Sequence, residues 1–229
     1  MLKTWNHLPK FMKTKEVRPY WKVLYKRRGQ LALKRAFDFI VAAVLLIILA
    51  IPMLVIGIMI KLDSKGPVFF RQERVTAYGR IFRIHKFRTM VTDADKKGQV
   101  LTVGIDPRIT KVGHKIRKYR LDELPQLIDV LKGDMTFVGT RPEVMKYVMQ
   151  YKKAYNATLL LPAGITSEAS IKFKDEAKLL DGVENVDEAY INKILPQKMR
   201  LNLNDIRRFS VVRDLRIMCK TVLAVINRN

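Results

Sequence analysis

The sequence predicts an α+β protein: a small, mostly helical cytosolic domain with a short β-hairpin, attached to an N-terminal, proline-bent, re-entrant membrane helix. Three observations lead to this fold class. Residues 39–60 are apolar without interruption, residues 68–90 alternate as two strands around a glycine, and much of the remaining chain repeats apolar residues at helical spacing. We therefore divide the chain into a basic interfacial leader (1–38), a membrane helix (39–60) and a cytosolic domain with amphipathic interfacial helices (61–229).

The charge of the chain is strongly unbalanced, with 44 Lys and Arg against 21 Asp and Glu and a net charge of +23. Such a field attracts nucleic acid, anionic lipid head groups or phosphorylated substrates. Cys219 is the only cysteine, which rules out an internal disulfide or a cysteine zinc cluster. A reducing, cytosol-facing location is therefore expected.

The leader, residues 1–38, is predicted to lie on a membrane surface. It holds 11 Lys and Arg against 2 acids, and Trp21, Leu24 and Tyr25 are interleaved with its cations. Cations mixed with aromatic and apolar residues are typical of segments that bind anionic lipid. A solvated charged face is the simpler alternative.

The apolar run, residues 39–60, has the length of a membrane helix. A straight helix of its 22 residues would be about 33 Å long, against a hydrocarbon core of roughly 30 Å. A buried core helix is the alternative, but core helices of this length usually have a polar face. The run follows a long basic leader, so it does not have the position of a cleaved signal peptide.

The flanks of the run and its proline favour a re-entrant helix. Residues 1–38 and 61–90 are both basic, and cationic flanks are retained on the cytoplasmic side, so both ends should lie on the same side. Pro52 removes one helical hydrogen bond and divides the run into arms of 13 and 8 residues. These arms, about 20 and 12 Å long, are too short to span. We predict a bend at Pro52, with a single-pass helix as the alternative.

The next segment reads as a β-hairpin. VFFRQERV and IFRIHKFRTM alternate apolar and polar residues, and Gly79 lies in the turn between them. The polar positions are mostly Arg and Lys, so one face is cationic. Lys86 and Arg88, in KFRTM, are counted as candidate substrate-binding residues.

The stretch RLDELPQLIDVLKGDM, residues 120–135, places two acids at the start of an expected helix. Pro125 suits the first turn and Gly133 the C-terminal cap, so Asp122 and Glu123 lie at the positive N-terminal end. Most acid pairs at such a position only stabilise the helix.

Two arginines near the acid pair in the sequence favour a catalytic role for it. Arg117 precedes it by five residues and Arg141 follows the helix, so both could approach Asp122. A carboxylate among guanidinium groups stays ionised and can attack phosphorus while the cations neutralise phosphate oxygens. The second carboxylate, Glu123, could hold Mg²⁺ on a diphosphate.

Six ordered motifs carry a family resemblance over about residues 33–145. They are KRAFDF before the apolar run, GPVFFRQERV, KFRTM, DPRITKVG, LDELPQLIDVLKGDM and VGTRPE. Together they resemble the bacterial sugar transferases, and more narrowly the monotopic polyprenyl-phosphate phosphoglycosyl transferases of the initiating type.

The resemblance implies an enzyme on the cytosolic face of the bacterial inner membrane. It would transfer sugar 1-phosphate from a UDP-sugar to polyprenyl phosphate, usually undecaprenyl phosphate, and release UMP, which is the first membrane step of glycoconjugate assembly. Asp122 matches the family nucleophile and Glu123 the Mg²⁺-binding partner, while Arg117 and Arg141 match arginines that serve phosphate and nucleotide. Membrane lipid and a second copy of the chain are further expected partners.

The chain departs from the family pattern at several positions. Ile51 precedes Pro52 where relatives often have Ser, and Asp129 stands where relatives often have Asn. In PAGITSEASIKF, Ser167 and Glu168 replace the Gly and Trp frequent in relatives. The sugar is therefore not assigned from the sequence.

Two other functions compete with this interpretation. A nucleic-acid-binding protein would also be basic, but it has no use for a long apolar run, so nucleic acid is not expected as a partner. A non-catalytic basic membrane adaptor would share the leader and the membrane helix. It would not require Asp122.

Overall fold

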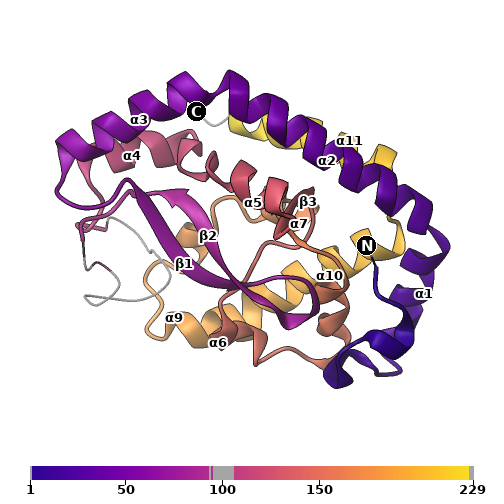
Figure 1. Ribbon diagram of the computed structural model, residues 1–229. Coiled ribbons are helices and arrows are strands. Elements are labelled where there is room, and N and C mark those ends of the chain that lie inside the picture. The colour runs from indigo at the N-terminus through magenta and orange to yellow at the C-terminus, as the bar shows by residue number, and fades with distance from the viewer. Residues whose placement is uncertain (1, 93, 95–105, 227–229) are drawn as a thin grey trace.

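The computed structural model describes residues 2–92, 94 and 106–226, and helices dominate these residues, as predicted. Helices cluster around two small sheets (Figure 1). The α-helices are α1 (Arg18–Lys26), α2 (Arg28–Ile48), α3 (Ala50–Asp63), α4 (Lys111–Lys118), α5 (Gln126–Lys132), α6 (Met145–Val148), α7 (Glu168–Lys172), α8 (Glu176–Leu179), α9 (Val186–Ala189), α10 (Leu195–Arg207) and α11 (Val211–Ile226). The strands are β1 (Phe69–Val75), β2 (Ile81–Phe87), β3 (Met135–Val138) and β4 (Ala163–Thr166).

Helices α2 and α3 form a bent pair that runs along one side of the molecule (Figure 1). The two axes differ by 62°, and Leu49 separates the helices. Pro52 has no amide N–H for the carbonyl of Ile48, and its ring crowds that carbonyl, so α2 ends at Ile48. The predicted bend is confirmed. Its vertex lies three residues before the proline that causes it.

The two helices have the length and composition of a membrane element only when they are taken together. Among the described residues, no single helix is long and apolar enough to cross a membrane, whereas α2 and α3 together pass that test on length and composition alone. Near the bend, Ile47 is 77% exposed and Ile51 is 74% exposed. The opposite side packs on the domain through Ala42, Ile56 and Ile60.

The hairpin has the predicted form. β1 and β2 pair antiparallel from Phe69 opposite Phe87 to Val75 opposite Ile81. Gly79, in the turn, has a φ of 77°, which favours glycine. Buried Asp129 of α5 holds β2 in place through His85. Its side chain accepts a 2.9 Å hydrogen bond from the backbone amide of His85, and the His85 ring nitrogen Nδ1 lies 2.6 Å from its other oxygen.

The acid pair lies in a tighter turn than predicted. Asp122 and Glu123 belong to a 3₁₀ turn, Leu121–Glu123, and Pro125 then caps α5 from just outside the helix. Gly133 ends α5 in the left-handed conformation, with a φ of 81°, as the sequence predicted. Arg120 also has a positive φ, 55°, and turns the chain sharply from α4 into the acid pair.

The second sheet was not predicted. β3 follows α5 directly and pairs parallel with β4, from Met135 opposite Ala163 to Val138 opposite Thr166. Just past β3, the backbone of Gly139 comes so close to Gly164 that a Cβ at position 164 would lie 2.2 Å from an atom of Gly139. The two strands therefore approach at a distance that only glycine allows.

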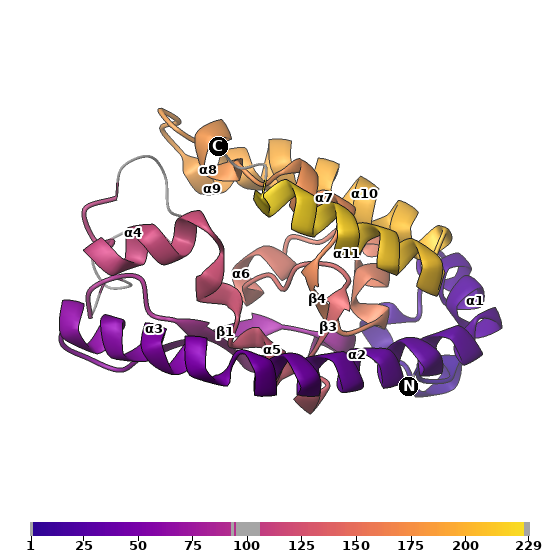
Figure 2. The ribbon, with the colours of Figure 1, turned by 90° about the horizontal axis from the view of Figure 1, so that it is seen from above.

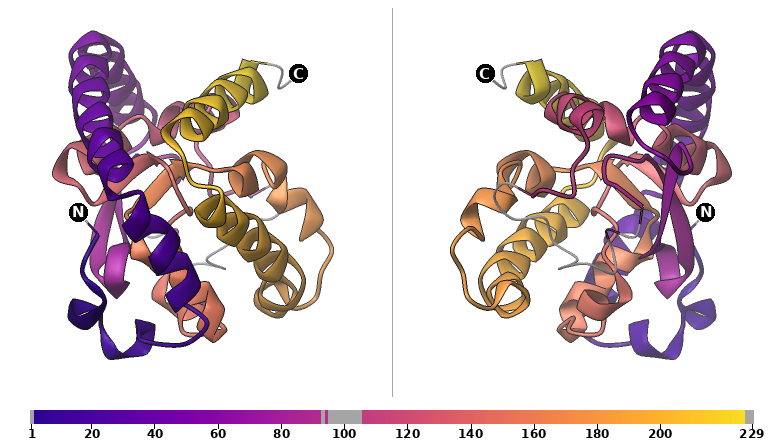
Figure 3. Two further views of the ribbon diagram at one scale, coloured as in Figure 1. Left: turned by 90° about the vertical axis from the view of Figure 1, so that its right-hand side faces the viewer. Right: turned by 90° about the vertical axis from the view of Figure 1, so that its left-hand side faces the viewer.

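Helix α11 docks on the core with one face and exposes the other. It packs on the domain through Ile217, which is 1% exposed, and beside α2 and α7. Its other face exposes Val222, Leu223 and Ile226. The bent pair and α11 lie on the same side of the molecule and spread apart from each other there (Figures 2 and 3). Both elements expose apolar side chains.

Candidate active site

The acid pair opens into a cavity of about 430 Å³ between the hairpin, α4 and α10. Seven Lys and Arg line this cavity against four carboxylates, so it suits an anionic ligand. We call it the cationic pocket. Its charged lining residues are Arg74, Lys86, Arg117, Arg120, Asp122, Glu123, Arg141, Glu143, Lys174, Glu176 and Lys198.

Glu123 is held by three cations. Its Oε1 accepts from Arg141 Nη2 at 2.6 Å and from Lys86 Nζ at 3.1 Å, and Arg120 Nη1 lies 3.7 Å away. Burial alone would raise the pKa of Glu123, but Arg141 and Lys86 outweigh burial and hold that pKa well below its usual range. Glu123 is therefore ionised, and the same contact raises the pKa of Arg141.

The pKa of Asp122 shifts in the opposite direction. Burial raises its pKa from the ordinary value, and the negative charge of Glu123 raises it further, while Lys86, Arg117 and Arg141 oppose the rise. The sequence predicted only the effect of the cations. Adjacent acids with opposite pKa shifts indicate different roles, and the more basic carboxylate is the better nucleophile once ionised.

Asp122 stands between two cavities. Besides the cationic pocket, it lines a cavity of about 360 Å³ under the hairpin. Arg117 and Lys86 line both cavities as well. Burial lowers the pKa of Lys86, and Glu123 counters this effect. Five of the six residues proposed for catalysis and substrate binding from the sequence therefore meet at one place, whereas Arg88 does not join them; the five are Lys86, Arg117, Asp122, Glu123 and Arg141.

Arg88 has a different environment. Its side chain donates to the carbonyls of Pro67 at 2.7 Å, Lys65 at 2.7 Å and Ser64 at 2.8 Å, and the residue is 5% exposed. It lines neither the cationic pocket nor the cavity under the hairpin. Arg88 therefore fixes the chain after α3 to the hairpin. Its donors are turned to the backbone, and substrate binding by Arg88 stays a prediction.

The far wall of the cationic pocket holds a buried network that sequence reasoning missed. Lys198 Nζ donates to Glu176 at 2.9 Å, to the hydroxyl of Tyr190 at 2.9 Å and to Glu143 at 3.3 Å. Burial would raise the pKa of Glu143, but Lys198 and Tyr190 lower it. Glu143 stands beside Arg141 in VGTRPE, which was the one available signal. Lys198 comes from a segment without a recognisable motif.

The residues that depart from the family pattern have structural contacts here. The Ser167 side chain caps α7 by accepting from the Ser170 amide at 3.0 Å. Glu168 accepts from Lys220 of α11 at 2.9 Å. Both residues therefore fix α7, which carries Ser170 into the cationic pocket.

The carboxylates fit a metal that is shared with a phosphorylated ligand. Among the described residues, no group of three or more His, Cys, Asp or Glu could hold a metal ion by itself. Mg²⁺ needs only one or two protein carboxylates where phosphate oxygens complete its shell. Ionised Glu123, with Asp122 beside it, offers such a donor set.

The chain belongs to the bacterial sugar transferase family, whose model matches residues 29–228. It is 34% identical over 85% of its length to the UDP-N-acetylgalactosamine-undecaprenyl-phosphate N-acetylgalactosaminephosphotransferase of Aeromonas hydrophila. It is also 34% identical over 83% of its length to the UDP-glucose:undecaprenyl-phosphate glucose-1-phosphate transferase of Escherichia coli. A protein of the same description from Caulobacter vibrioides is 34% identical over 82% of this chain.

The chain spans 44% of the length of the Aeromonas relative, 39% of the Escherichia relative and 68% of the Caulobacter relative. The region that the family model matches, residues 29–228, includes the acid pair, the hairpin and α3, together with α2 from its second residue.

Proposed function

We propose that this protein is a phosphoglycosyl transferase that moves sugar 1-phosphate from a UDP-sugar to polyprenyl phosphate, such as undecaprenyl phosphate, and releases UMP. One observation carries the proposal: two adjacent carboxylates with opposite pKa shifts, Asp122 and Glu123, face a cavity in which cations outnumber acids. The names of the relatives, which act on undecaprenyl phosphate, support it.

In the first step, an oxygen of ionised Asp122 attacks the β-phosphorus of the UDP-sugar. A bond forms between that oxygen and phosphorus, the phosphoanhydride bond breaks, and UMP leaves with the electron pair. Arg117, Arg141 and Lys86 line the cavity around the acid pair, where they neutralise the charge on the phosphate oxygens and on the departing UMP. The sugar 1-phosphate is then linked to Asp122 as an acyl phosphate.

In the second step, a phosphate oxygen of the polyprenyl phosphate attacks the same phosphorus. The acyl-phosphate bond breaks, Asp122 leaves as a carboxylate, and a polyprenyl diphosphate sugar forms. One phosphoanhydride replaces another over the full cycle, so little net driving force is expected. The site must therefore keep water away from the acyl phosphate, and the partial burial of Asp122 serves this purpose.

Magnesium would be held by Glu123 together with the diphosphate of the donor. When bound, it would supply further positive charge to the phosphate oxygens. Arg141 and Lys86 keep Glu123 ionised and oriented toward the cavity.

We propose that the bent pair enters one leaflet on the cytosolic side of the bacterial inner membrane and returns. Its exposed apolar side chains and its basic flanks support this placement. In a Cys219→Ser background, single cysteines at Lys22 and Lys65 should both react with an impermeant maleimide from the cytosolic side only. Labelling from opposite sides would show that the pair spans the bilayer.

The covalent mechanism is tested with Asp122→Asn in membranes or nanodiscs. UMP release from a panel of UDP-sugars with undecaprenyl phosphate should fall by about three orders of magnitude or more, since the nucleophile is lost. Donor labelled with ³²P in the β-phosphate should label the parent chain and not the variant. Glu73→Gln, an exposed acid on the hairpin, is the control and should keep full activity.

Unchanged turnover in Asp122→Asn would reject the aspartyl intermediate. If the parent chain releases no UMP with any donor of the panel, the alternative of a non-catalytic membrane adaptor is favoured instead.

A further inference from the structure

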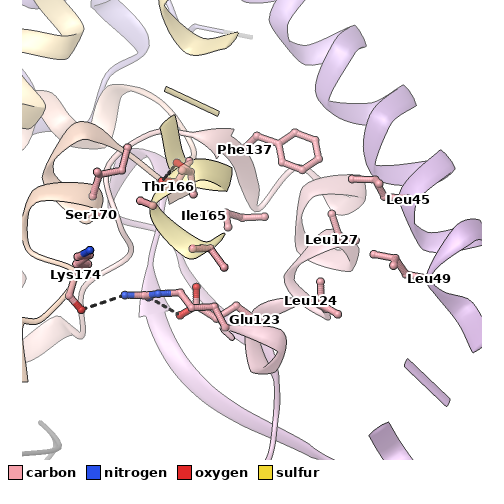
Figure 4. Close-up of a pocket in the computed structure, with 15 residues that line it drawn as sticks. Leu45, Leu49, Glu123, Leu124, Leu127, Phe137, Ile165, Thr166, Ser170 and Lys174 are labelled. Atoms are coloured by element: carbon pink, nitrogen blue, oxygen red, sulfur yellow. Dashed lines mark hydrogen bonds and ion pairs between the residues drawn. The ribbon is translucent and has the colours of Figure 1, made fainter. Parts of the chain in front are cut away.

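An apolar groove of about 250 Å³ lies between the bent pair and α11 (Figure 4). Aliphatic and aromatic side chains from α2, α5, β3, β4, α7 and α11 line it. Leu45 comes from the end of α2, Leu49 from the bend between α2 and α3, and Leu127 from α5. The remaining apolar lining residues are Leu124, Phe137, Ile165, Ile171, Ala224 and Val225.

The inner end of the groove is charged. Arg120, Glu123 and Lys174 line the groove there, and all three also line the cationic pocket. Arg120 Nη2 donates to the carbonyl of Lys174 at 3.3 Å while its Nη1 lies 3.7 Å from Glu123, as the dashed lines in Figure 4 show. The groove therefore reaches Glu123 of the acid pair along apolar walls, whereas the cationic pocket reaches both acids along charged walls.

The helices on both sides of the groove also expose apolar side chains that do not line it. Leu49 is the vertex of the bend, and its neighbours Ile48 and Ile51 are 64% and 74% exposed. On α11, Val222 and Leu223 are each 58% exposed. A water-soluble ligand gains no binding free energy from such apolar surroundings, whereas a lipid chain gains by leaving water.

We propose that this groove holds the first isoprene units of the acceptor, with the acceptor phosphate against Arg120 and Lys174. The proposal rests on the proposed function, because it takes polyprenyl phosphate as the acceptor. An apolar channel that ends at two cations beside a carboxylate pair matches an amphiphile with an apolar tail and an anionic head. The donor then approaches Asp122 through the cationic pocket, and the acceptor approaches through the groove.

A matched pair of variants on α11 tests the groove. Ala224 lines it, and Ala224→Trp should fill it, whereas Leu223→Trp places the same ring on the exposed face of the same helix. For Ala224→Trp, the KM for undecaprenyl phosphate should rise at least about tenfold, which corresponds to about 1.4 kcal/mol. The burst of UMP that reports the first step should stay as in the parent. Leu223→Trp should change neither quantity.

Photoaffinity labelling of the unaltered chain gives an independent answer, which holds even if Ala224→Trp does not fold. The probe is a polyprenyl phosphate with a diazirine in its first isoprene unit, used in nanodiscs. Labelled peptides should come from the groove, from residues 45–49, 124–137 or 221–225. Undecaprenyl phosphate should suppress this labelling, and phosphatidylglycerol should not.

Each other outcome overturns the inference. Labelling elsewhere, or equal acceptor KM values in the two tryptophan variants, would show that the tail does not use the groove. Suppression by phosphatidylglycerol would assign the groove to ordinary acyl chains. These results are distinct from a failure of the proposed function, in which the parent chain itself releases no UMP.

Discussion

The variant Arg88→Lys tests whether Arg88 holds the fold together or binds substrate. The change keeps the positive charge but replaces a planar guanidinium by a single ammonium. In the structure, the Arg88 side chain donates three short hydrogen bonds, of 2.7, 2.7 and 2.8 Å, to carbonyls in the segment after α3. One ammonium on a shorter side chain cannot reach all three. We therefore expect at least two of these bonds to be lost.

The cost follows from the number of bonds and their burial. Each hydrogen bond to a charged group contributes about 1.5 kcal/mol or more, so losing two lowers the free energy of unfolding by about 3 kcal/mol. For a chain of this size, about 2–4 °C of Tm accompanies each kcal/mol, which predicts a fall of about 6–12 °C. Arg83→Lys, at an exposed arginine on β2 whose side chain is 67% exposed, should change Tm by little.

Thermal unfolding of parent, Arg88→Lys and Arg83→Lys in the same nanodiscs and at one scan rate measures the effect. The KM for the UDP-sugar is measured below the transition and should stay close to that of the parent. If Arg88→Lys leaves Tm unchanged and raises the donor KM, then Arg88 binds substrate and the structural role described here is wrong.

Three further predictions follow from other contacts. Lys86→Met removes a positive charge that lowers the pKa of Asp122, so the pKa of Asp122 should rise. The acidic limb of the pH–rate profile for UMP release should then move to higher pH, and a limb that stays in place would contradict this reasoning. Asp129→Ala should lower the free energy of unfolding by about 3 kcal/mol, since the amide and ring of His85 lose their acceptor, while Asp129→Asn should recover most of it in thermal unfolding. Pro52→Ala restores the amide N–H and removes the ring clash, which together cost a helix about 3 kcal/mol. The bend should therefore straighten, and spin labels at the outer ends of α2 and α3 should move apart. An unchanged distance would show that another feature sets the bend.

Local features of the fold were predictable because nearby residues determine them. The hairpin turn at Gly79 and the end of α5 at Gly133 both depend on left-handed backbone that glycine favours, and the structure shows both. The bend followed from Pro52, although its vertex moved because a proline disturbs the carbonyl four residues earlier.

Features that depend on pairs distant in sequence were not predictable. Nothing around Lys198 indicated that it would reach Glu143 across 55 positions, and nothing in KFRTM showed that Arg88 would turn to the backbone after α3 while Lys86 turned to Glu123. The parallel pairing of β3 and β4 likewise depends on tertiary packing, since each strand has only four residues.

The close approach of Gly139 and Gly164 has a consequence for how much change the enzyme tolerates. A methyl group at position 164 would meet the opposite backbone at 2.2–2.5 Å and force the two strands apart. β4 carries Ile165 into the groove, so even a shift of about one ångström would alter the shape of that channel. A mutational scan scored for lipid-linked product should therefore find alanine at 164 as harmful as a change at the carboxylates, although this glycine touches no reacting atom.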